Sequence, residues 1–432
     1  MKKLGYYIKC LRAVAEEAPD KRSGRHNAKY LMSDICLAGF SVFFMQSPSF
    51  LAHQCALASR KGRSNLQTLF HNVQNPSDNH IRQMLDGVPA EHFDPVYFKI
   101  IADVRSADKF NIFQPIEGRA LVALDGSEYF SSYKIHCPQC STRKHSNGEV
   151  EYYHRLLGAS IVTPSQNMAL PLPPEFISPQ DEGKKQDCEQ RAAARWLDKN
   201  MPKIAELNPI FLGDDLYAHQ PLCQKIVSHE ASFIFTCKPS SHKTLYEYLK
   251  GVECESLTIS KPLPGKGLRQ YRYRWFNEVP IRDGDTALKV NWLSLEISDP
   301  KGKIKPSKYS FVTDLAVGAE NIESLVRCAR ARWKIENETF NVLKNNGYNF
   351  AHNFGHGRQT LAAVLAALNL LAFSMHTACR LTSRAWQQAE SVFSAKNHLF
   401  IHLWSLCMYH IFGSWNELLD SIISGVPPPS KI

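Results

Sequence analysis

The sequence lacks both a secretory signal and a disulfide framework. Residues 1–17 start with a basic stretch but contain no apolar core of signal length. The 12 cysteines do not have the regular, dense spacing that small secreted domains use for disulfides. These two absences predict a cytosolic protein whose thiols stay reduced.

Long hydrophobic runs are scarce, and only residues 360–379 are apolar enough to suggest a membrane span. That run contains Asn369, Ser374 and His376, and no second span accompanies it. The pattern therefore predicts a buried core helix and no membrane partner.

What the sequence does have is a globular composition with an excess of positive charge. Its 432 residues are 44% hydrophobic and 21% charged, which is enough for a large core divided into two or three units. The formal net charge is +10 and the pI is near 8.9. This balance favours a polyanionic partner such as nucleic acid.

The hydrophobic pattern changes along the chain and predicts an α/β protein with a helical region at each end. Helical spacing covers residues 1–115, and strands then alternate with helices over 116–230. Alternating, aromatic-rich segments predict a β-strand insertion over 231–315. Residues 316–357 return to the α/β core with one prominent helix, and 358–432 are helical again.

The first helical region is a candidate DNA-binding region. Its short predicted helix NPSDNHIRQMLDGV exposes Arg82, a side chain that suits contact with a DNA phosphate. A small helical domain with an ordinary solvated face is the alternative.

The prominent helix, from Arg330 to Lys344, carries a carboxylate in an unusual position. The stretch RARWKIENETFNVLK has no Gly or Pro, and its apolar residues share one arc of a wheel drawn at about 100° per residue. Glu336 falls inside that arc beside Arg332, whereas Glu338 falls on the polar side. A carboxylate facing a core is costly unless a partner compensates it. The pattern indicates either a buried Arg332–Glu336 ion pair or a carboxylate directed at a metal.

Two further acids follow apolar strands. The run ALVALD ends on Asp125, and PIFLGD ends on Asp214, with Asp215 as a competitor whose other role is an Asx turn or helix cap. We place both carboxylates at strand ends, a usual position for a site in an open α/β sheet. Together with Glu336 they form three hard oxygen ligands, which suit Mg²⁺ or Mn²⁺ and phosphodiester chemistry.

These motifs resemble the DDE transposases of bacterial insertion sequences. ALDGSEYF resembles their first motif, FLGDDLYA their second, and RARWKIENETFNVLK their Tyr-Arg-Glu-Lys signature. The resemblance covers residues 118–357. Within this family the sequence most resembles the cut-and-paste branch, which carries a β-strand insertion before the catalytic Glu. It implies an RNase H-like mixed sheet flanked by helices and interrupted by that insertion.

The resemblance also implies roles for individual residues. Asp125, Asp214 and Glu336 would be catalytic and would hold Mg²⁺ or Mn²⁺. The DNA contacts would come from four side chains: Arg330, Arg332, Lys344 and Trp275. Ala329 stands where the branch often has Tyr, and Lys344 lies one residue later than the usual signature Lys.

Trp275 belongs to the β insertion, where the resemblance implies a Trp that stacks on a base flipped from the end of a DNA strand. Trp292 is its rival for this role. A place in the hydrophobic core is the alternative for both rings.

The resemblance predicts a bacterial, cytoplasmic enzyme that cleaves transposon ends and joins their 3′-hydroxyl to target DNA. Its partners would be double-stranded DNA, both terminal inverted repeats and target, and a second copy of the chain in a dimeric synaptic complex. When bound to DNA it would be associated with the nucleoid. The alternatives are a catalytically inactive transposase-derived DNA-binding protein and an unrelated metal-dependent nuclease.

A second group of metal-ligand residue types lies in HCPQCSTRKHSNGEVEYYH. Cys137 and Cys140 form a CxxC pair. Three histidines are near it in the sequence: His136, His145 and His154. A Zn²⁺ knuckle needs four ligands and only one proper pair is present, so Zn²⁺ and two reduced thiols in a β-hairpin both fit. His352 and His356, in HNFGHG, are also ligand types, but the sequence favours a role in their loop.

Overall fold

One mixed sheet runs through the part of the chain that the structure, a computed structural model, describes: residues 3–22, 28–57, 64–179, 188–263, 267–299 and 305–426. It has 11 strands in the order β2-β3-β1-β6-β7-β11-β10-β9-β8, with β4 and β5 paired to β3. The strands are β1 (Leu121–Ser132), β2 (Ser141–Lys144), β3 (Val150–Val162), β4 (Ala169–Pro171), β5 (Glu175–Ile177), β6 (Ile210–Gly213), β7 (Ser232–Thr236), β8 (Glu255–Leu263), β9 (Gly267–Pro280), β10 (Lys289–Ser298) and β11 (Ser307–Thr313). The predicted mixed α/β fold is confirmed.

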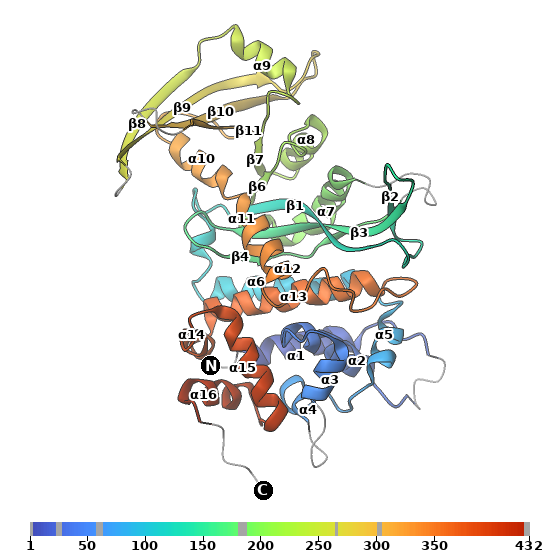
Figure 1. Ribbon diagram of the computed structural model, residues 1–432. Coiled ribbons are helices and arrows are strands. Elements are labelled where there is room, and N and C mark those ends of the chain that lie inside the picture. Colours follow the sequence, from blue (N-terminus) through green and yellow to red (C-terminus); the bar gives the residue numbers. More distant parts are fainter. Residues whose placement is uncertain are drawn as a thin grey trace.

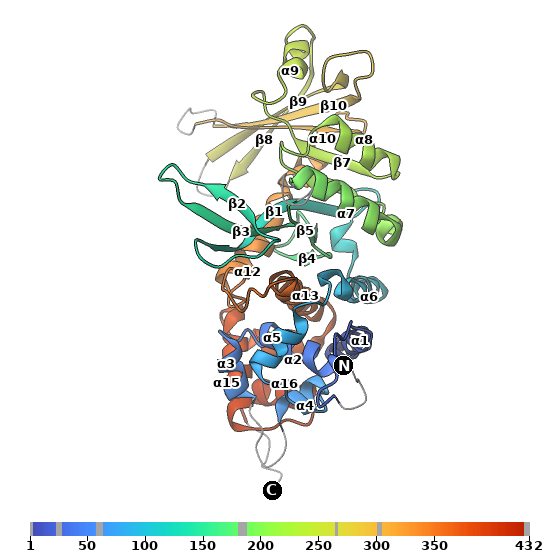
Figure 2. The same ribbon diagram turned by 90° about the vertical axis from the view of Figure 1, so that its right-hand side faces the viewer.

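The centre of the sheet combines antiparallel and parallel pairs. β1 pairs antiparallel with β3 and parallel with β6, and β6 pairs parallel with β7. Parallel strands need a crossover, which α8 (Gln220–Ser228) supplies between β6 and β7, and α7 (Glu189–Ile204) precedes β6. Both helices cover one face of the sheet (Figures 1 and 2). The other face is left for the segment that carries Glu336.

The β-rich tier at the top of Figure 1 is an extension of this same sheet. β7 lies inside the predicted insertion 231–315, but it pairs with β6 and therefore belongs to the central sheet. α9 (Lys243–Lys250) and β8 to β11 follow, and β11 pairs antiparallel with β7. The insertion starts after β7 and lengthens the sheet by hydrogen bonding.

The segment that carries Glu336 is interrupted, where the sequence predicted one straight helix. It consists of α10 (Ile322–Arg330), α11 (Trp333–Ile335), the π-helical turn η6 (Glu336–Phe340) and α12 (Asn341–Asn345). A break at Ala331 and a π turn both change the angle between successive side chains, so a wheel at constant angle fails here. Trp333, predicted on the apolar arc, is consequently 50% exposed, whereas Phe340 is buried.

The helical tier at the bottom of Figure 1 combines both ends of the described chain. Its N-terminal elements are α1 (Lys3–Glu16), α2 (Met32–Phe44), α3 (Phe50–Ala56), α4 (Asn65–Phe70), α5 (Asp78–Leu85) and α6 (Asp94–Ser106). Its C-terminal elements are α13 (Leu361–Thr382), α14 (Arg384–Ser391), α15 (Lys396–Tyr409) and α16 (Trp415–Ser424). Short 3₁₀ turns complete the connections: η2 (Ala90–Phe93), η3 (Asn111–Phe113) and η5 (Ala205–Leu207).

α13 is the run that the sequence predicted as a buried helix, and this prediction is confirmed. Among the described residues it is the one helix long and apolar enough to cross a membrane, and 89% of its apolar window is buried inside the fold. It packs against α2 and α6 on one side and β4 on the other. Its polar side chains make hydrogen bonds there: Asn369 Nδ2 donates to the carbonyl of Tyr348 at 2.9 Å, and His376 Nδ1 lies 2.7 Å from the Tyr348 hydroxyl.

At Gly158 of β3, the Phe340 ring of the Glu336 segment packs directly on the sheet. A Cβ at this position would lie 2.5 Å from the Phe340 ring, so Gly158→Ala must displace that ring. We expect Gly158→Ala to lower the free energy of unfolding by about 1–3 kcal/mol, as overpacking does, measured by urea unfolding. Gly158→Ala combined with Phe340→Leu should recover part of the loss.

Gly5→Ala is the matched control, because a Cβ at Gly5 has nothing within 4 Å. An equal loss of stability in this control, or no loss in Gly158→Ala, would contradict the close packing of Phe340 on β3.

Candidate functional site

The parallel pairing of β1 with β6 brings Asp125 and Asp214 together. The last pair in register is Ala123 opposite Leu212, and continuing it by two residues sets Asp125 opposite Asp214. β6 ends at Gly213, but β1 continues in its hairpin with β3, so Asp125 lies within a strand and not at its end as predicted. Both carboxylates still lie at the carboxyl edge of the parallel pair, where open α/β sheets place sites.

Glu336 approaches these acids from the face of the sheet that α7 and α8 do not cover. It is the first residue of the π turn η6, and the preceding α11 packs against β1 and β3. Its Oε1 accepts a hydrogen bond from Arg332 Nη1 at 2.6 Å. The side chain of Arg332 is only 8% exposed and that of Glu336 is 36% exposed. The ion pair that the sequence allowed is present, and it lies beside the two aspartates.

The pKa of Asp125 reflects both its burial and the acids around it. Burial raises the pKa of Asp125 to about 7, the charges of Glu336, Glu189 and Asp214 raise it as well, and Arg332 opposes them. We call Asp125, Glu189, Asp214 and Glu336 the acid cluster. Crowded carboxylates of this kind need a proton or a cation, and they are found at functional sites.

Glu189, in the first turn of α7, is the member of the acid cluster that the sequence analysis did not assign to a site. Its carboxylate lies 3.3 Å from the Tyr217 hydroxyl and 3.6 Å from Arg155 Nη1. A Cβ at Gly126 would clash with the Glu189 carboxyl group, so this side chain passes directly over β1. The structure places Gly126 inside β1, and a glycine inside a strand often marks such a close approach, but the sequence analysis ended this strand at Asp125.

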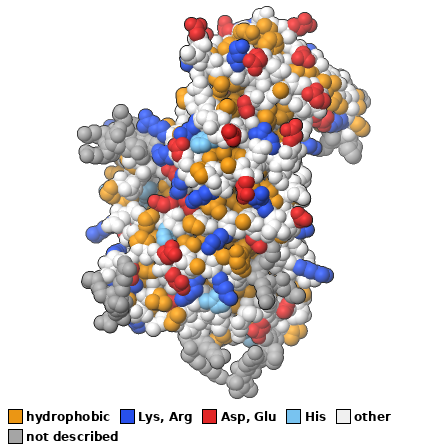
Figure 3. Space-filling view, turned by 180° about the vertical axis from the view of Figure 1, so that it is seen from behind, with side chains coloured by type: hydrophobic (Ala, Val, Ile, Leu, Met, Phe, Trp, Pro, Cys, Tyr) orange, Lys and Arg blue, Asp and Glu red, His pale blue; other side chains and the backbone are white. Residues whose placement is uncertain are grey.

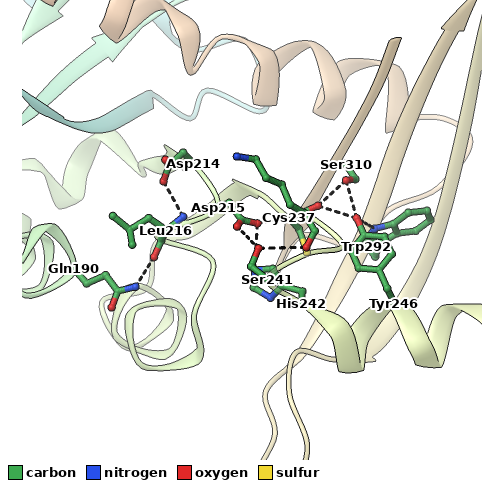
Figure 4. Close-up of polar contacts among 11 residues, drawn as sticks. Gln190, Asp214, Asp215, Leu216, Cys237, Ser241, His242, Tyr246, Trp292 and Ser310 are labelled. Atoms are coloured by element: carbon green, nitrogen blue, oxygen red, sulfur yellow. Dashed lines mark hydrogen bonds and ion pairs between the residues drawn. The ribbon is translucent and has the colours of Figure 1, made fainter. Parts of the chain in front are cut away.

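Asp214 and Asp215 point in different directions (Figure 4). Asp214 Oδ1 accepts from the backbone N–H of Leu216 at 2.8 Å, which is an Asx turn. Asp215 accepts from the backbone N–H of Lys238 at 2.5 Å and from the hydroxyl of Ser241. Asp215 thereby fixes the connection between β7 and α9, and Asp214 is the one whose charge acts on the acid cluster.

A groove of about 490 Å³ adjoins the acid cluster at Asp214. Its lining includes five cationic side chains, which define the basic groove: Lys238, Arg272, Arg274, Lys308 and Arg332. Its acidic lining residues are Asp214 and Glu296. On the face seen in Figure 3, by contrast, positive and negative side chains are interspersed. The basic groove has the charge that a nucleic-acid backbone requires.

An exposed aromatic ring also lines the basic groove. Trp333 is 50% exposed, and the Arg332 guanidinium lies 4.5 Å from its ring centre. The sequence did not identify this ring as a site residue, because the wheel placed it in the core.

Of the cations that the sequence proposed for DNA contact, Arg332 and Lys344 lie near the acid cluster. Partial desolvation lowers the pKa of Lys344, and the charges of Glu128 and Asp125 oppose that shift. Arg330 lines a neighbouring groove together with Trp333, over the Tyr309 ring at 4.9 Å.

Arg82 and Trp275 are not brought to this site. Arg82 donates to Asp78 Oδ2 at 2.5 Å and to the carbonyl of Phe354 at 3.3 Å, and so links α5 to the loop after α12. Trp275 is 2% exposed and Trp292 is 5% exposed. Trp275 lies in the core because it alternates along β9 with the solvent-facing Arg272 and Arg274. Trp292 has buried neighbours on both sides in β10, and its ring lines the basic groove, where its Nε1 donates to the Tyr246 hydroxyl at 3.3 Å. The expectation that Trp275 is available to stack on a base is corrected accordingly.

A second cluster lies beyond the end of β1. Four residues have ligand atoms within 4.8 Å of one another and could hold a metal ion: Cys137, Cys140, His154 and His356. The sequence identified the cysteine pair but assigned His356 to a loop, because nothing local connects it to the CxxC segment. His136 instead stacks on Tyr152, and His145 Nε2 lies 3.0 Å from Glu151. All 12 cysteines lie in described residues, and none of them forms a disulfide bond.

Comparison with known proteins assigns no family to this chain. No protein-family model matches it, and no curated protein matches its sequence. Any function assigned to the two clusters is therefore argued from their geometry.

The raised pKa of Asp125 predicts how stability depends on pH in the absence of metal. Between about pH 3.9, the pKa of an unfolded Asp, and about 7, the folded state binds more protons than the unfolded state. The free energy of unfolding therefore falls as pH rises through this window, by at most about 1.4 kcal/mol per unit. Asp125→Asn should lack this slope and be more stable than the wild type at alkaline pH, measured by urea unfolding in chelator.

Asp94 also has a pKa raised by burial, to about 6, and therefore adds a pH dependence of the same sign. This contribution is present in both the wild type and Asp125→Asn, so it cancels when the two are compared. The difference between the two pH curves thus isolates Asp125, and parallel curves would contradict its raised pKa.

Proposed function

We propose that the chain is a DNA transposase that cleaves strands at transposon ends and joins the 3′-hydroxyl to target DNA. Asp125, Asp214 and Glu336 are its catalytic carboxylates. The observation that carries this proposal is the convergence of the three acids, from two strands and a π turn, beside the basic groove.

The acid cluster fits a hard divalent cation such as Mg²⁺ or Mn²⁺. Its donors are all carboxylate oxygens, which are the ligands these ions prefer. Burial, and after it the charges of the neighbouring acids, raise the pKa of Asp125, and a bound cation would favour its ionised form. Two such ions would activate the attacking oxygen and stabilise the leaving oxygen of a phosphodiester.

The chain's own side chains would hold the DNA. Arg332 orients Glu336 through one nitrogen while its guanidinium lines the basic groove, so a phosphate bound there would lie next to the acids. The other cations of the groove can bind neighbouring phosphates. Trp333 offers an exposed ring for an unpaired base.

The sheet gives further support to an RNase H-like catalytic core. An antiparallel β3–β1 pair continues into parallel β6 and β7, helices cover both faces, and a β-rich insertion separates β7 from the Glu336 segment. The positive net charge agrees with double-stranded DNA as partner, and the synaptic complex would be a dimer. Inverted repeats flanking the gene would identify the DNA substrate.

Asp125→Ala, Asp214→Ala and Glu336→Gln should each abolish Mg²⁺-dependent cleavage of that flanking DNA, because each removes a carboxylate of the site. Binding of the same DNA, measured by fluorescence anisotropy, should remain close to wild type. Glu338→Gln is the control and should keep most of its activity. Cleavage near the wild-type rate in either Asp variant would rule out the proposed site.

A labelled oligonucleotide with a free 3′-hydroxyl separates the possible classes. Covalent joining to plasmid DNA supports a transposase, and cleavage without joining indicates a metal-dependent nuclease. DNA binding by the wild type with neither reaction would indicate an inactive relative of such enzymes.

Trp333→Ala and Trp275→Ala should have opposite effects. Loss of the exposed Trp333 ring should weaken binding of single-stranded DNA ends by about 1–3 kcal/mol and leave stability nearly unchanged. Loss of the buried Trp275 ring should lower the free energy of unfolding by about 3–5 kcal/mol. Anisotropy titrations and urea unfolding measure the two effects, and a stability loss in Trp333→Ala without weaker binding would contradict its proposed role.

A further inference from the structure

We propose that Cys137, Cys140, His154 and His356 bind one structural Zn²⁺. The cysteines come from the loop after β1, His154 comes from β3, and His356 comes from the loop between α12 and α13. This site is separate from the acid cluster and does not depend on the proposed DNA chemistry.

Five of the six distances between the ligand atoms are close to those of a tetrahedral zinc site, and all four atoms lie within 4.8 Å of one another. With Zn–S near 2.3 Å and Zn–N near 2.0–2.1 Å, a tetrahedron sets its ligands about 3.8 Å (S to S), 3.6 Å (S to N) and 3.3 Å (N to N) apart. The two Sγ atoms are 3.9 Å apart, and the two Nε2 atoms are 3.1 Å apart. His154 Nε2 lies 3.6 Å from Cys137 Sγ and 3.4 Å from Cys140 Sγ. Cys140 Sγ also lies 3.4 Å from His356 Nε2.

Hydrogen bonds around the cluster hold these ligand atoms in positions suited to a metal. His356 Nδ1 lies 3.1 Å from the carbonyl of Gly357, so its N–H can donate there and leave Nε2 free as a ligand. The Cys137 N–H donates to Cys140 Sγ at 3.4 Å, and the Cys140 N–H donates to the Cys137 carbonyl at 3.1 Å, which closes the knuckle turn.

The cluster is also largely buried, which favours a structural role. Cys140, His154 and His356 are buried, and Cys137 is half-buried. Four protein ligands leave no open position for a substrate, as in structural zinc sites. The ligand set of thiolates and imidazoles suits Zn²⁺ and not the hard ions suited to the acid cluster.

The zinc would join segments that are far apart in the sequence. Cys140 and His356 are 216 residues apart. The loop of His356 is also fixed from the helical tier, since Asp86 accepts the backbone N–H groups of Arg358, Gln359, Thr360 and Leu361. The loop is thus tied to the sheet on one side by the ligands and to α5 on the other. Metal binding at such a junction adds directly to folding stability.

The test is the metal content of the full chain, produced in zinc-supplemented medium and purified under reducing conditions without chelator. Elemental analysis should find about one zinc per chain in the wild type. Cys140→Ser and His356→Ala should carry far less. His136→Ala is the matched control, since this histidine adjoins the CxxC pair but stacks on Tyr152, and it should keep its zinc. Asp125→Ala should also keep its zinc, which separates this site from the acid cluster.

Two measurements on the wild type keep the test valid if a ligand variant fails to fold. A strong chelator should lower the thermal midpoint, and added Zn²⁺ should restore it. Co²⁺ in place of zinc should give the visible absorption bands of a tetrahedral site with thiolate ligands. Wild-type protein without zinc that also binds no added Zn²⁺ or Co²⁺ would overturn the proposal. A Cys137–Cys140 disulfide in the reduced preparation would overturn it too, as would equal zinc loss in His136→Ala and His356→Ala.

Discussion

The partial burial of several carboxylates close to one another is the constraint on which the proposed site depends. Three backbone features bring the acids together: the β1–β6 register aligns Asp125 with Asp214, Gly126 lets Glu189 pass over the strand, and the π turn begins at Glu336. Burial, together with the charges of the neighbouring acids, raises the pKa of Asp125 to about 7, so ionising this side chain above that pH opposes folding. The divalent cation and the DNA that we propose for this site would offset that cost by binding beside the acids.

The two clusters differ in the type of ligand atom that they offer to a metal. The acid cluster offers oxygen only, and the second cluster offers sulfur and nitrogen, so each selects a different class of metal. The two clusters are also carried by the same two segments of the chain. β1 carries Asp125 and leads into Cys137, and the segment that begins with Glu336 leads to His356. A zinc ion at the second cluster would therefore hold in place the two segments that position the acids.

The sequence predicted those features that depend on local pattern, including the mixed α/β fold and the buried helix α13. It also identified Asp125, Asp214 and Glu336, which the structure brings together. It missed Trp333, because a wheel at constant angle cannot represent a break followed by a π turn. It missed Glu189 and His356 because their partners lie in distant segments, and no spacing in the sequence connects them.

The central claim is that the acid cluster is a site for divalent metal ions. Anomalous diffraction at the manganese edge, from crystals soaked in Mn²⁺, tests this directly and needs no knowledge of the DNA sequence. The account predicts anomalous peaks in contact with the carboxylates of Asp125, Asp214 and Glu336. Well-ordered carboxylates with no manganese between them, and with Glu336 still held by Arg332 alone, would contradict it.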